Sequence, residues 1–480
     1  MKKRLLAALL ASAAVLSFAG CNGNNSSSTA DNSSKPADDS SAADSSAADS
    51  SAADSSAADD SSVADETPAT ELTDDGDALT ILAWETNSDI VKMVDFFCQT
   101  KGYDSSKVVF KGVGEKGENA RDQYKQYLKG SDDADLMIFD ADWVADYINN
   151  DTLTVPYSAI GLDKSDFTEA FAYTLDYGTN DNGEFKAASF QATPGGFVYR
   201  ADLALQYLGV STPDEMQAKI SDWDKFQETG AQLYEASGNK TSLQATEGGL
   251  WQVFQSNRTQ PWVVDGKLVM DNAADFYDIA KAMKDNNSLA GVPQWQADWY
   301  AAIMDGTALG DFVPTWGLTT SGGGSILENF THNGDTELGK NMAICEGPSG
   351  WFWGGSYFGV TPKCNNKTLA KEFIEFFCKD AETMKAYAEQ TGDFMNNKTV
   401  MSEATISNPL LNGQDHYKVL VKVLDNLDLS NKLTKYDSVI KSKFNDSVNG
   451  YLDGKYATKE DAINAFKDDV ASAYEDIVIE

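Results

Sequence analysis

Tryptophans that stand beside carboxylates are the side chains of this chain best suited to grip a small molecule. Trp84 ends the apolar run 79–84 and Glu85 follows it, and Asp140 and Trp143 stand at the end of another apolar run. A flat indole can stack on the apolar face of a ring, and a neighbouring carboxylate can accept the protons of hydroxyl groups. These two places therefore indicate binding of a ligand with both apolar faces and polar edges.

A second concentration of rings lies in the stretch 342–378, where the turn GPSGWFWGGS separates two short apolar runs and a helical pattern follows. Glycines let a backbone bend sharply and pass close to a neighbour. Each ring by itself fits a packed core, but the group of Trp351, Phe352 and Trp353 among glycines is interpreted as a binding surface.

The candidate ligand contacts are aromatic residues at expected strand ends or chain crossings, together with two acids and one base. They are Trp84, Glu85, Asp140, Trp143, Trp251, Arg258, Trp295, Trp299, Trp316 and Trp353. The rings would stack on the ligand, Glu85 and Asp140 would accept hydroxyl protons, and Arg258 would donate. No His or Cys spacing is typical of a metal site and no nucleophile motif is present, so no catalytic residue, metal or cofactor is expected.

The elements that must position these residues are strands and helices in alternation. Apolar runs at 79–84, 108–110 and 135–139 alternate with helical patterns, which predicts an α/β fold with a parallel sheet. Ligands of such sheets bind beyond the carboxyl ends of the strands. Trp84 and Asp140 lie at those ends.

Length and charge bound the class of protein. Residues 78–480 have a globular composition and are too long for a single core, so two domains are expected. The formal net charge of the whole chain is −36. Nucleic acid and anionic lipid are therefore poor partners for it.

The first 77 residues predict an anchor and a tether. Residues 1–20 have a basic start and a short apolar run, typical of a signal peptide, and Phe18-Ala19-Gly20-Cys21 resembles a bacterial lipobox with Phe in place of the usual Leu. The resemblance implies a lipid on Cys21. Repeats of SSAAD dominate residues 21–77, and this composition favours a disordered linker.

Several segments, in order along the chain, resemble the carbohydrate-binding proteins of bacterial ABC importers, the maltose-binding-like extracellular solute-binding proteins of family 1. They are Tyr199-Arg200 with Asp202-Leu203 and Leu208-Gly209, PWVVDGKLVMD at 261–271, MDGTALGDFVPTW at 304–316, Gly354-Gly355-Ser356 with Asn366-Lys367 and the following helix, and the helical end 451–480.

That resemblance implies a two-lobed α/β fold with a hinge of crossing strands. The expected division is 78–194 with 317–352 as the N-terminal lobe, 195–316 with 353–405 as the C-terminal lobe, and 406–480 as a helical extension. Cys345 and Cys364 flank the two expected crossing strands, and the sequence leaves open whether they form a disulfide.

The implied function is capture of a carbohydrate between the lobes and delivery to the permease of an ABC importer, by a monomer held at the outer face of the cytoplasmic membrane. The number of tryptophans favours an oligosaccharide over a monosaccharide. Three alternatives remain: a peptide, polyamine or metal chelate as ligand of the same fold; a surface glycoside hydrolase, which would need two facing carboxylates; and a passive adhesin.

Overall fold

Two β-sheets form the framework of the protein. The computed structural model describes residues 71–83, 89–112, 123–124, 126, 134–320, 324–425, 427, 432 and 434–479. The expected signal peptide, Cys21 and most of the expected linker lie outside these residues. The first sheet has the order β2-β1-β3-β11-β4, and the second has the order β10-β5-β9-β6.

The first sheet is made of β1 (Leu79–Ala83), β2 (Val108–Gly112), β3 (Leu136–Asp140), β4 (Ala187–Ser189) and β11 (Ser356–Val360). β1 runs parallel to β2 and β3, whereas β11 is antiparallel to β3 and β4. The buried, unbroken apolar run of β1 is typical of a parallel strand covered on both faces. The carboxyl ends of β1 and β3 therefore open on the same edge of the sheet.

The second sheet is made of β5 (Gly195–Arg200), β6 (Ser242–Gln244), β9 (Ala308–Pro314) and β10 (Met342–Cys345). β5 is antiparallel to both β9 and β10, and β6 is parallel to β9. A separate small hairpin pairs β7 (Val263–Val264) with β8 (Lys267–Leu268). Its turn is Asp265-Gly266, the hairpin signal present in the sequence.

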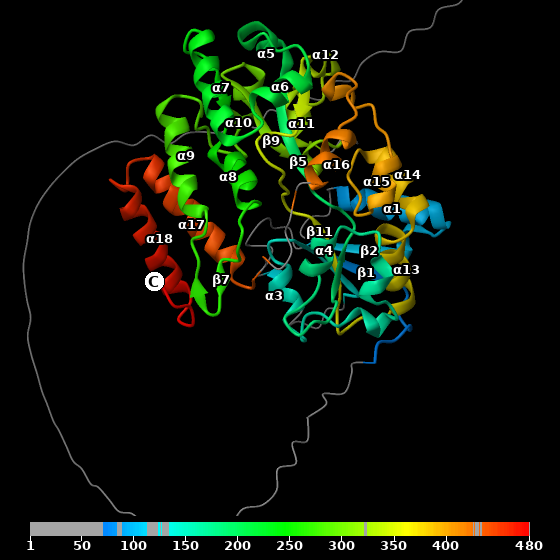
Figure 1. Ribbon diagram of the computed structural model, residues 1–480. Helices are drawn as coiled ribbons and strands as arrows, with labels where there is room; N and C mark the ends of the chain where they lie inside the picture. Colours follow the sequence, from blue (N-terminus) through cyan, green and yellow to red (C-terminus); the bar gives the residue numbers. More distant parts are fainter. Residues whose placement is uncertain are drawn as a thin grey trace, which may run out of the picture. The chain divides into compact units, whose positions relative to one another are not determined.

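Helices cover the sheets in two groups (Figure 1). Those that belong with the first sheet are α1 (Asp89–Lys101), α3 (Val144–Ile148), α4 (Ala172–Tyr177), α13 (Lys367–Cys378), α14 (Ala381–Thr391) and α15 (Lys398–Glu403). Those around the second are α5 (Ala201–Leu208), α6 (Pro213–Lys219), α7 (Trp223–Ala236), α8 (Glu247–Gln255), α9 (Ala273–Asp285), α10 (Ala297–Met304), α11 (Ile326–Phe330), α12 (Thr336–Gly339), α16 (Tyr417–Asp425), α17 (Asp437–Leu452) and α18 (Lys459–Ala473). Short 3₁₀ turns are η1 (Ser105–Lys107), η2 (Tyr157–Ile160), η3 (Lys164–Phe167), η4 (Thr315–Gly317) and η5 (Pro409–Leu411).

Three segments cross between the sheets, and two of them pair with each other. Residues 190–194 lead from β4 to β5, residues 346–355 lead from β10 to β11, and residues 404–436 lead from α15 to α17. The Gly195 amide donates to the Trp351 carbonyl at 3.3 Å, and the Trp353 amide donates to the Thr193 carbonyl at 3.0 Å. A Cβ on Gly195 would lie 2.2 Å from Trp351 Cζ2, so only glycine allows this approach.

The strand pairing reverses part of the expected division into lobes. β10, within the segment 317–352 expected in the N-terminal lobe, pairs with β5 of the second sheet. β11, within the segment 353–405 expected in the C-terminal lobe, pairs with β3 of the first sheet. The crossing lies in the Gly/aromatic turn between these two strands, whereas β9, where a return crossing was expected, stays in the second sheet.

The C-terminal helices belong to the second lobe. Ile440, Phe444 and Val448 repeat every four residues along α17 and are buried with Phe466 of α18 and Phe276 of α9. The ring of Phe444 lies 5.4 Å from that of Phe466. Figure 1 shows α9, α17 and α18 side by side. The expected extension 406–480 is therefore largely part of the second lobe's core.

Residues 71–77, expected as the last part of the disordered linker, are instead attached to the first lobe. Leu72 is buried, and the Lys367 amide donates to the Thr73 carbonyl at 3.1 Å. The Asp74 carboxylate accepts from the Thr368 amide at 2.8 Å and from the Thr368 hydroxyl at 2.9 Å. Because Thr368 lies in the first turn of α13, Asp74 caps a helix almost 300 positions away.

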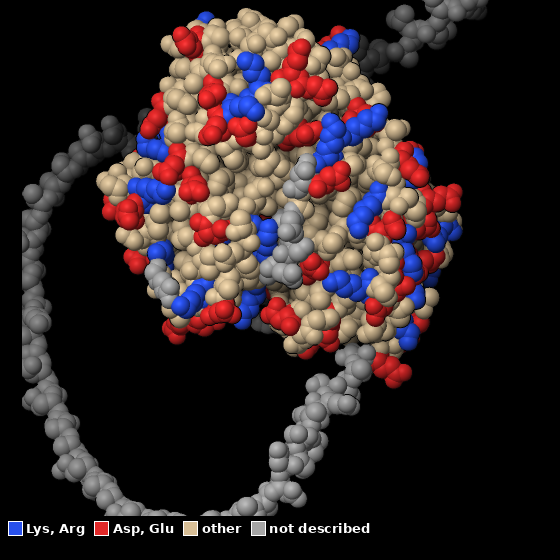
Figure 2. All heavy atoms as spheres, viewed as in Figure 1, with Lys and Arg blue, Asp and Glu red and all other residues tan. Residues whose placement is uncertain are grey.

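The cysteines, the lengths of the helices and the surface charges add three further observations. Cys98, Cys345, Cys364 and Cys378 are all buried free thiols, so Cys345 and Cys364 form no disulfide. In the part of the chain that the structure describes, no helix is long and apolar enough to cross a bilayer. Figure 2 shows acidic and basic side chains interspersed over the face in view.

Replacing Asp74 with alanine should lower the free energy of unfolding by about 1 kcal/mol, because two first-turn donors of α13 lose their acceptor. Urea denaturation measures the change. Asp77→Ala is the control, because Asp77 accepts from Lys107 Nζ through its backbone carbonyl and not its side chain. Equal stability of Asp74→Ala and the parent would contradict the capping role.

Candidate functional site

Asp140, the last residue of β3, lies where the two lobes meet. Its carboxylate accepts from the Asp142 amide at 2.8 Å, which fixes the turn that follows the strand. Gly354 of the crossing segment has a φ of +74°, and a Cβ there would lie 3.2 Å from Asp140 Oδ2 and 3.5 Å from Trp316 Nε1. The crossing segment therefore runs directly over this carboxyl group.

The charge state of Asp140 depends on its surroundings. Burial, and then repulsion by Asp142, raise its pKa to about 7, while the bond from the Asp142 amide and the positive charge of Lys441 act in the opposite direction. Such a carboxyl group can either accept or donate a hydrogen bond near neutral pH. This suits a ligand whose hydroxyls can do both.

Three indoles from three segments gather beside Asp140. Trp295 and Trp316 lie nearly parallel with ring centroids 6.0 Å apart, and Trp353 lies 5.3 Å from Trp316 at 71°. Trp316 Nε1 donates to the Trp353 carbonyl at 3.0 Å. Trp295 is 48% exposed and has a φ of +68°, an uncommon backbone conformation for a bulky residue. The half-exposed indole of Trp295 can therefore take part in stacking, and it is linked to the partly buried Asp140 through Trp316.

A cavity of about 300 Å³ lies between the turn after β3 and the helices of the second lobe. Its lining residues are Asp142, Trp143, Trp251, Gln252, Gln255, Ser438, Lys441, Ser442, Asn445 and Asp446. Lys441 Nζ contacts Asp142 Oδ1 at 3.0 Å across it. Gln255 donates to Gln252 Oε1, while its own Oε1 is buried without a partner. A buried acceptor of this kind needs a donor, which a ligand hydroxyl would supply.

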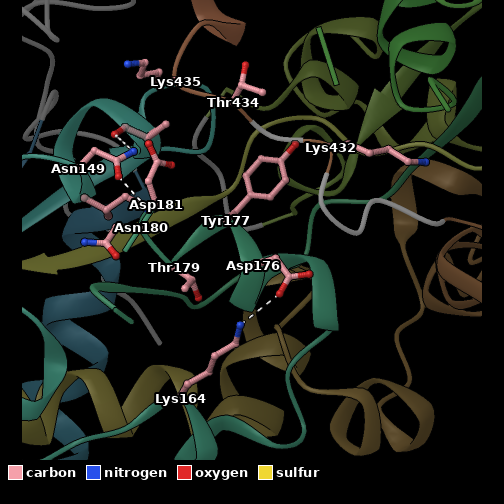
Figure 3. A pocket seen from close by; sticks show the side chains of 12 residues that line it. Asn149, Lys164, Asp176, Tyr177, Thr179, Asn180, Asp181, Lys432, Thr434 and Lys435 are labelled. Carbon is pink, nitrogen blue, oxygen red and sulfur yellow. Dashed lines mark hydrogen bonds and ion pairs between the residues drawn. The ribbon is translucent and has the colours of Figure 1, made fainter. Parts of the chain in front are cut away.

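A neighbouring cavity of about 320 Å³ lies between α3, α4 and residues 432–435 (Figure 3). Most polar groups in it are already bonded to one another. Lys164 pairs with Asp176 at 3.1 Å, and Asn149 accepts from the Asp181 amide at 2.8 Å while donating to the Ala145 carbonyl at 3.0 Å. The cavity at Trp143 is therefore the better candidate site.

The structure brings together five of the residues expected in the site. Asp140, Trp295, Trp316 and Trp353 form one group, and Trp143 lies beyond Asp142 in the adjoining cavity. Trp84 and Glu85 lie outside the described residues. Asp140 and Trp143, singled out because they follow an apolar strand, thus lie at the boundary between the lobes, and their contact with a ligand stays a prediction.

Three other expected contacts are committed to the core. Trp299 is fully buried and donates Nε1 to Asp311 at 2.6 Å. Trp251 is 1% exposed and its ring stacks on Phe444 at 4.5 Å, although its edge reaches the cavity. Direct stacking of a ligand on either ring does not fit this arrangement, because packing already covers their faces.

Arg258 is also held inside the second lobe. Its guanidinium donates to the carbonyls of Val269 at 2.9 Å and Met270 at 3.0 Å, and it lies 3.6 Å from the centre of the Trp262 ring. Burial lowers its pKa to about 10. Since its donors serve backbone carbonyls, the expectation that it donates to a ligand is corrected: Arg258 ties the chain before β7 to the chain after β8.

The wall of the cavity formed by α17 was not predicted from the sequence. Ser438, Lys441, Ser442 and Asn445 recur at helical spacing, next to the apolar stripe that contains Ile440 and Phe444. A polar stripe on an amphipathic helix is typical of a face turned to solvent. Only the packing of α17 against the second lobe shows that this stripe faces the other lobe instead.

Two α/β lobes, joined by paired crossing segments and separated by a cavity with indoles and polar side chains, define a two-lobed solute-binding protein. Comparison of the sequence with known families agrees. Residues 108–412 match the family described as bacterial extracellular solute-binding protein, and the chain belongs to that family.

Solved structures share the fold at low sequence identity. A crystal structure of an extracellular solute-binding protein of family 1 superposes with a TM-score of 0.69 at 16% identity, covering 83% of this chain and 100% of its own. An ABC transporter-associated binding protein from B. animalis subsp. lactis Bl-04, in complex with β-1,6-galactobiose, gives 0.64 at 18% identity, covering 84% and 99%. The galacto-N-biose-/lacto-N-biose I-binding protein from Bifidobacterium longum, in complex with lacto-N-biose, gives 0.64 at 13%, covering 85% and 100%. No curated protein matches the sequence.

Asp140→Asn should change how stability depends on pH. Because burial raises the pKa of Asp140 from 3.8 to about 7, the folded chain binds more protons than the unfolded chain between these values, and the parent loses stability as pH rises. The free energy of unfolding of the parent minus that of Asp140→Asn should therefore fall between about pH 4 and pH 7, by at most about 1.4 kcal/mol per pH unit.

Urea denaturation at several pH values measures this difference. The control is Asp181→Asn, a substitution of an exposed acid in the turn after α4, which should leave the pH dependence of the parent unchanged. A difference between parent and Asp140→Asn that stays constant or grows with pH would contradict the account of Asp140.

Proposed function

We propose that this protein is a lipid-anchored extracellular binding protein that captures an oligosaccharide between its two lobes and delivers it to an ABC importer. The observation that carries the carbohydrate assignment is that aromatic rings, a carboxyl group and a polar cavity lie together at the boundary between the lobes. A group of three indoles, the half-exposed Trp295 with the partly buried Trp316 and Trp353, reaches a titratable acid, Asp140, through Trp316 and Gly354. The next cavity is lined with amides, hydroxyls and an ion pair.

The chemistry of a sugar matches this combination. A pyranose ring has apolar C–H faces and a rim of hydroxyls, so it needs flat rings for the faces and mixed donors and acceptors for the rim. Gln255 Oε1 offers an acceptor without a partner, and Asp140 can act in either direction. Two sugar-bound solved structures with the same fold, described above, support this assignment.

A cationic ligand such as a polyamine is the alternative that the site itself suggests, because Asp140 and Asp142 stand near indoles. Lys441 already neutralises Asp142 at 3.0 Å, which leaves less uncompensated negative charge for a cation. The balance of charge therefore favours a neutral, hydroxyl-rich ligand. The membrane anchor is proposed from Cys21 and its preceding residues, and the importer from family membership.

Titration with a panel of oligosaccharides, polyamines and peptides, followed by indole fluorescence, tests the proposal. We expect a saturable change with at least one oligosaccharide, because Trp295 is half exposed and Trp143 lines the cavity. Saturation by an amine or a peptide alone would replace the carbohydrate assignment with the corresponding ligand class.

Trp295→Ala should weaken binding of that oligosaccharide about tenfold, which is about 1.4 kcal/mol, without loss of fold, because the ring is half exposed. Isothermal titration calorimetry measures the dissociation constant. The matched control is Trp223→Ala, which removes a partly buried indole packed on Phe226 of α7. It should leave the affinity for the oligosaccharide unchanged. If Trp295→Ala binds as tightly as the parent, the indole group is not the stacking surface.

A further inference from the structure

The feature that leads beyond ligand capture is the reach of Lys441 from one lobe to the other. Lys441 stands on α17, which packs into the second lobe through the neighbouring residues Ile440, Phe444 and Val448. The ring of Trp251, from α8 of the same lobe, stacks on Phe444 with centroids 4.5 Å apart. Lys441 is therefore carried by the second lobe as part of a rigid unit.

Its partner, Asp142, is held in the first lobe by backbone hydrogen bonds of the turn after β3. The backbone of Asp142 donates to Asp140, and the amide of the intervening Ala141 donates to the Gly355 carbonyl at 2.9 Å. Since Asp140 ends β3, the carboxylate of Asp142 is held within two residues of the first sheet. The 3.0 Å contact between Lys441 Nζ and Asp142 Oδ1 thus joins two bodies rather than two side chains of one body.

The surroundings of this pair differ from those of ion pairs within a lobe. The Lys441 side chain is 17% exposed, whereas Lys284, which pairs with Asp453 at the same 3.0 Å inside the second lobe, is 39% exposed. Burial disfavours the charge of Lys441, but Asp142, Tyr177 and Asp437 outweigh it and raise its pKa. A pair shielded in this way is less screened by salt than one in open solvent.

The pair also borders the space that a ligand would fill. Lys441 lines the cavity at Trp143 and the small cavity beside Tyr177 and Arg258. An ammonium group carries three donors and a carboxylate two acceptor oxygens, so the pair can bond to each other and to a ligand hydroxyl at the same time.

We propose that Lys441 and Asp142 form a latch between the lobes, which stabilises the closed arrangement before ligand binds and slows release of the ligand afterwards. Lys441 is a positioning residue: it sets the equilibrium between open and closed lobes, and a ligand that bridges the pair adds to the same closure. The effect on ligand release rests on the proposed function, whereas the effect on the lobes themselves does not.

The lobe arrangement without ligand is the first test. Nitroxide labels are placed on Thr152→Cys in the first lobe and Asp275→Cys in the second, two exposed positions, and pulsed electron paramagnetic resonance measures the distance between them. Cys21 is replaced by serine so that it takes no label. Cys98, Cys345, Cys364 and Cys378 can stay, because they are buried. Lys441→Gln should shift the distance distribution away from that of the parent and broaden it. Lys284→Gln, the matched pair within one lobe, should not.

Charge reversal separates the ion pair from a general loss of packing. The double variant Lys441→Asp with Asp142→Lys should restore the parental distribution, because the same attraction is rebuilt with its ends exchanged. The latch is overturned if Lys441→Gln leaves the distribution unchanged, if Lys284→Gln alters it equally, or if the reversed pair fails to restore it.

Ligand kinetics supply the second test with any oligosaccharide that binds in the panel. Lys441→Gln should raise its dissociation rate about three- to tenfold with little change in the association rate, as expected when a partly buried ion pair worth about 1 kcal/mol is lost. An unchanged dissociation rate contradicts the ligand-release part. If no oligosaccharide binds at all, the proposed function fails, and the distances between the labels still decide whether the latch exists.

Discussion

The pairing of two crossing segments is the constraint on which the rest of this structure depends. Thr193 and Gly195 exchange backbone hydrogen bonds with Trp353 and Trp351, so the chain leaving the first sheet and the chain returning to it run side by side. The glycine at 195 is what permits this close approach. Because the two segments are hydrogen-bonded to each other, Trp353 is held where the crossing passes over Asp140.

This constraint also explains why the site contains residues from distant parts of the chain. β3 delivers Asp140 and Asp142 from the first lobe, and the crossing segment delivers Trp353. Residues after β9 deliver Trp316, and α17 brings Lys441 from near the C-terminus. β3 and α17 each pack into the core of their own lobe, and the candidate site lies where the two lobes meet. The proposed binding and the proposed closure of the lobes therefore depend on the same few contacts.

Much of the fold could be predicted from local patterns. The apolar runs identified β1 and β3, and the residues directly after β3 proved to lie at the boundary between lobes, as the rule for parallel sheets expects. The lobe assignment of β10 and β11 could not be read in the same way. Both strands are short and wholly buried, and such runs do not specify which sheet they join.

The individual site residues were harder to predict, because an indole in a core and an indole in a site look alike in sequence. Trp299 and Trp295 are four residues apart, yet one is sealed by its bond to Asp311 and the other stands exposed in a left-handed conformation. Lys441 could not be predicted as a site residue either, although it is polar and not aromatic. Its polar stripe resembles an ordinary solvent-facing helix surface, and only long-range packing distinguishes the two.

The short strap at residues 71–77 determines where a mechanical load would enter the molecule. It is fastened to the start of α13 through Thr73 and Asp74, on the lobe that holds β1 and β3. A pull transmitted along the chain from its N-terminal side would thus enter the molecule at the start of α13. It would reach the second lobe only through the crossing segments and through contacts between the lobes such as that of Lys441 with Asp142.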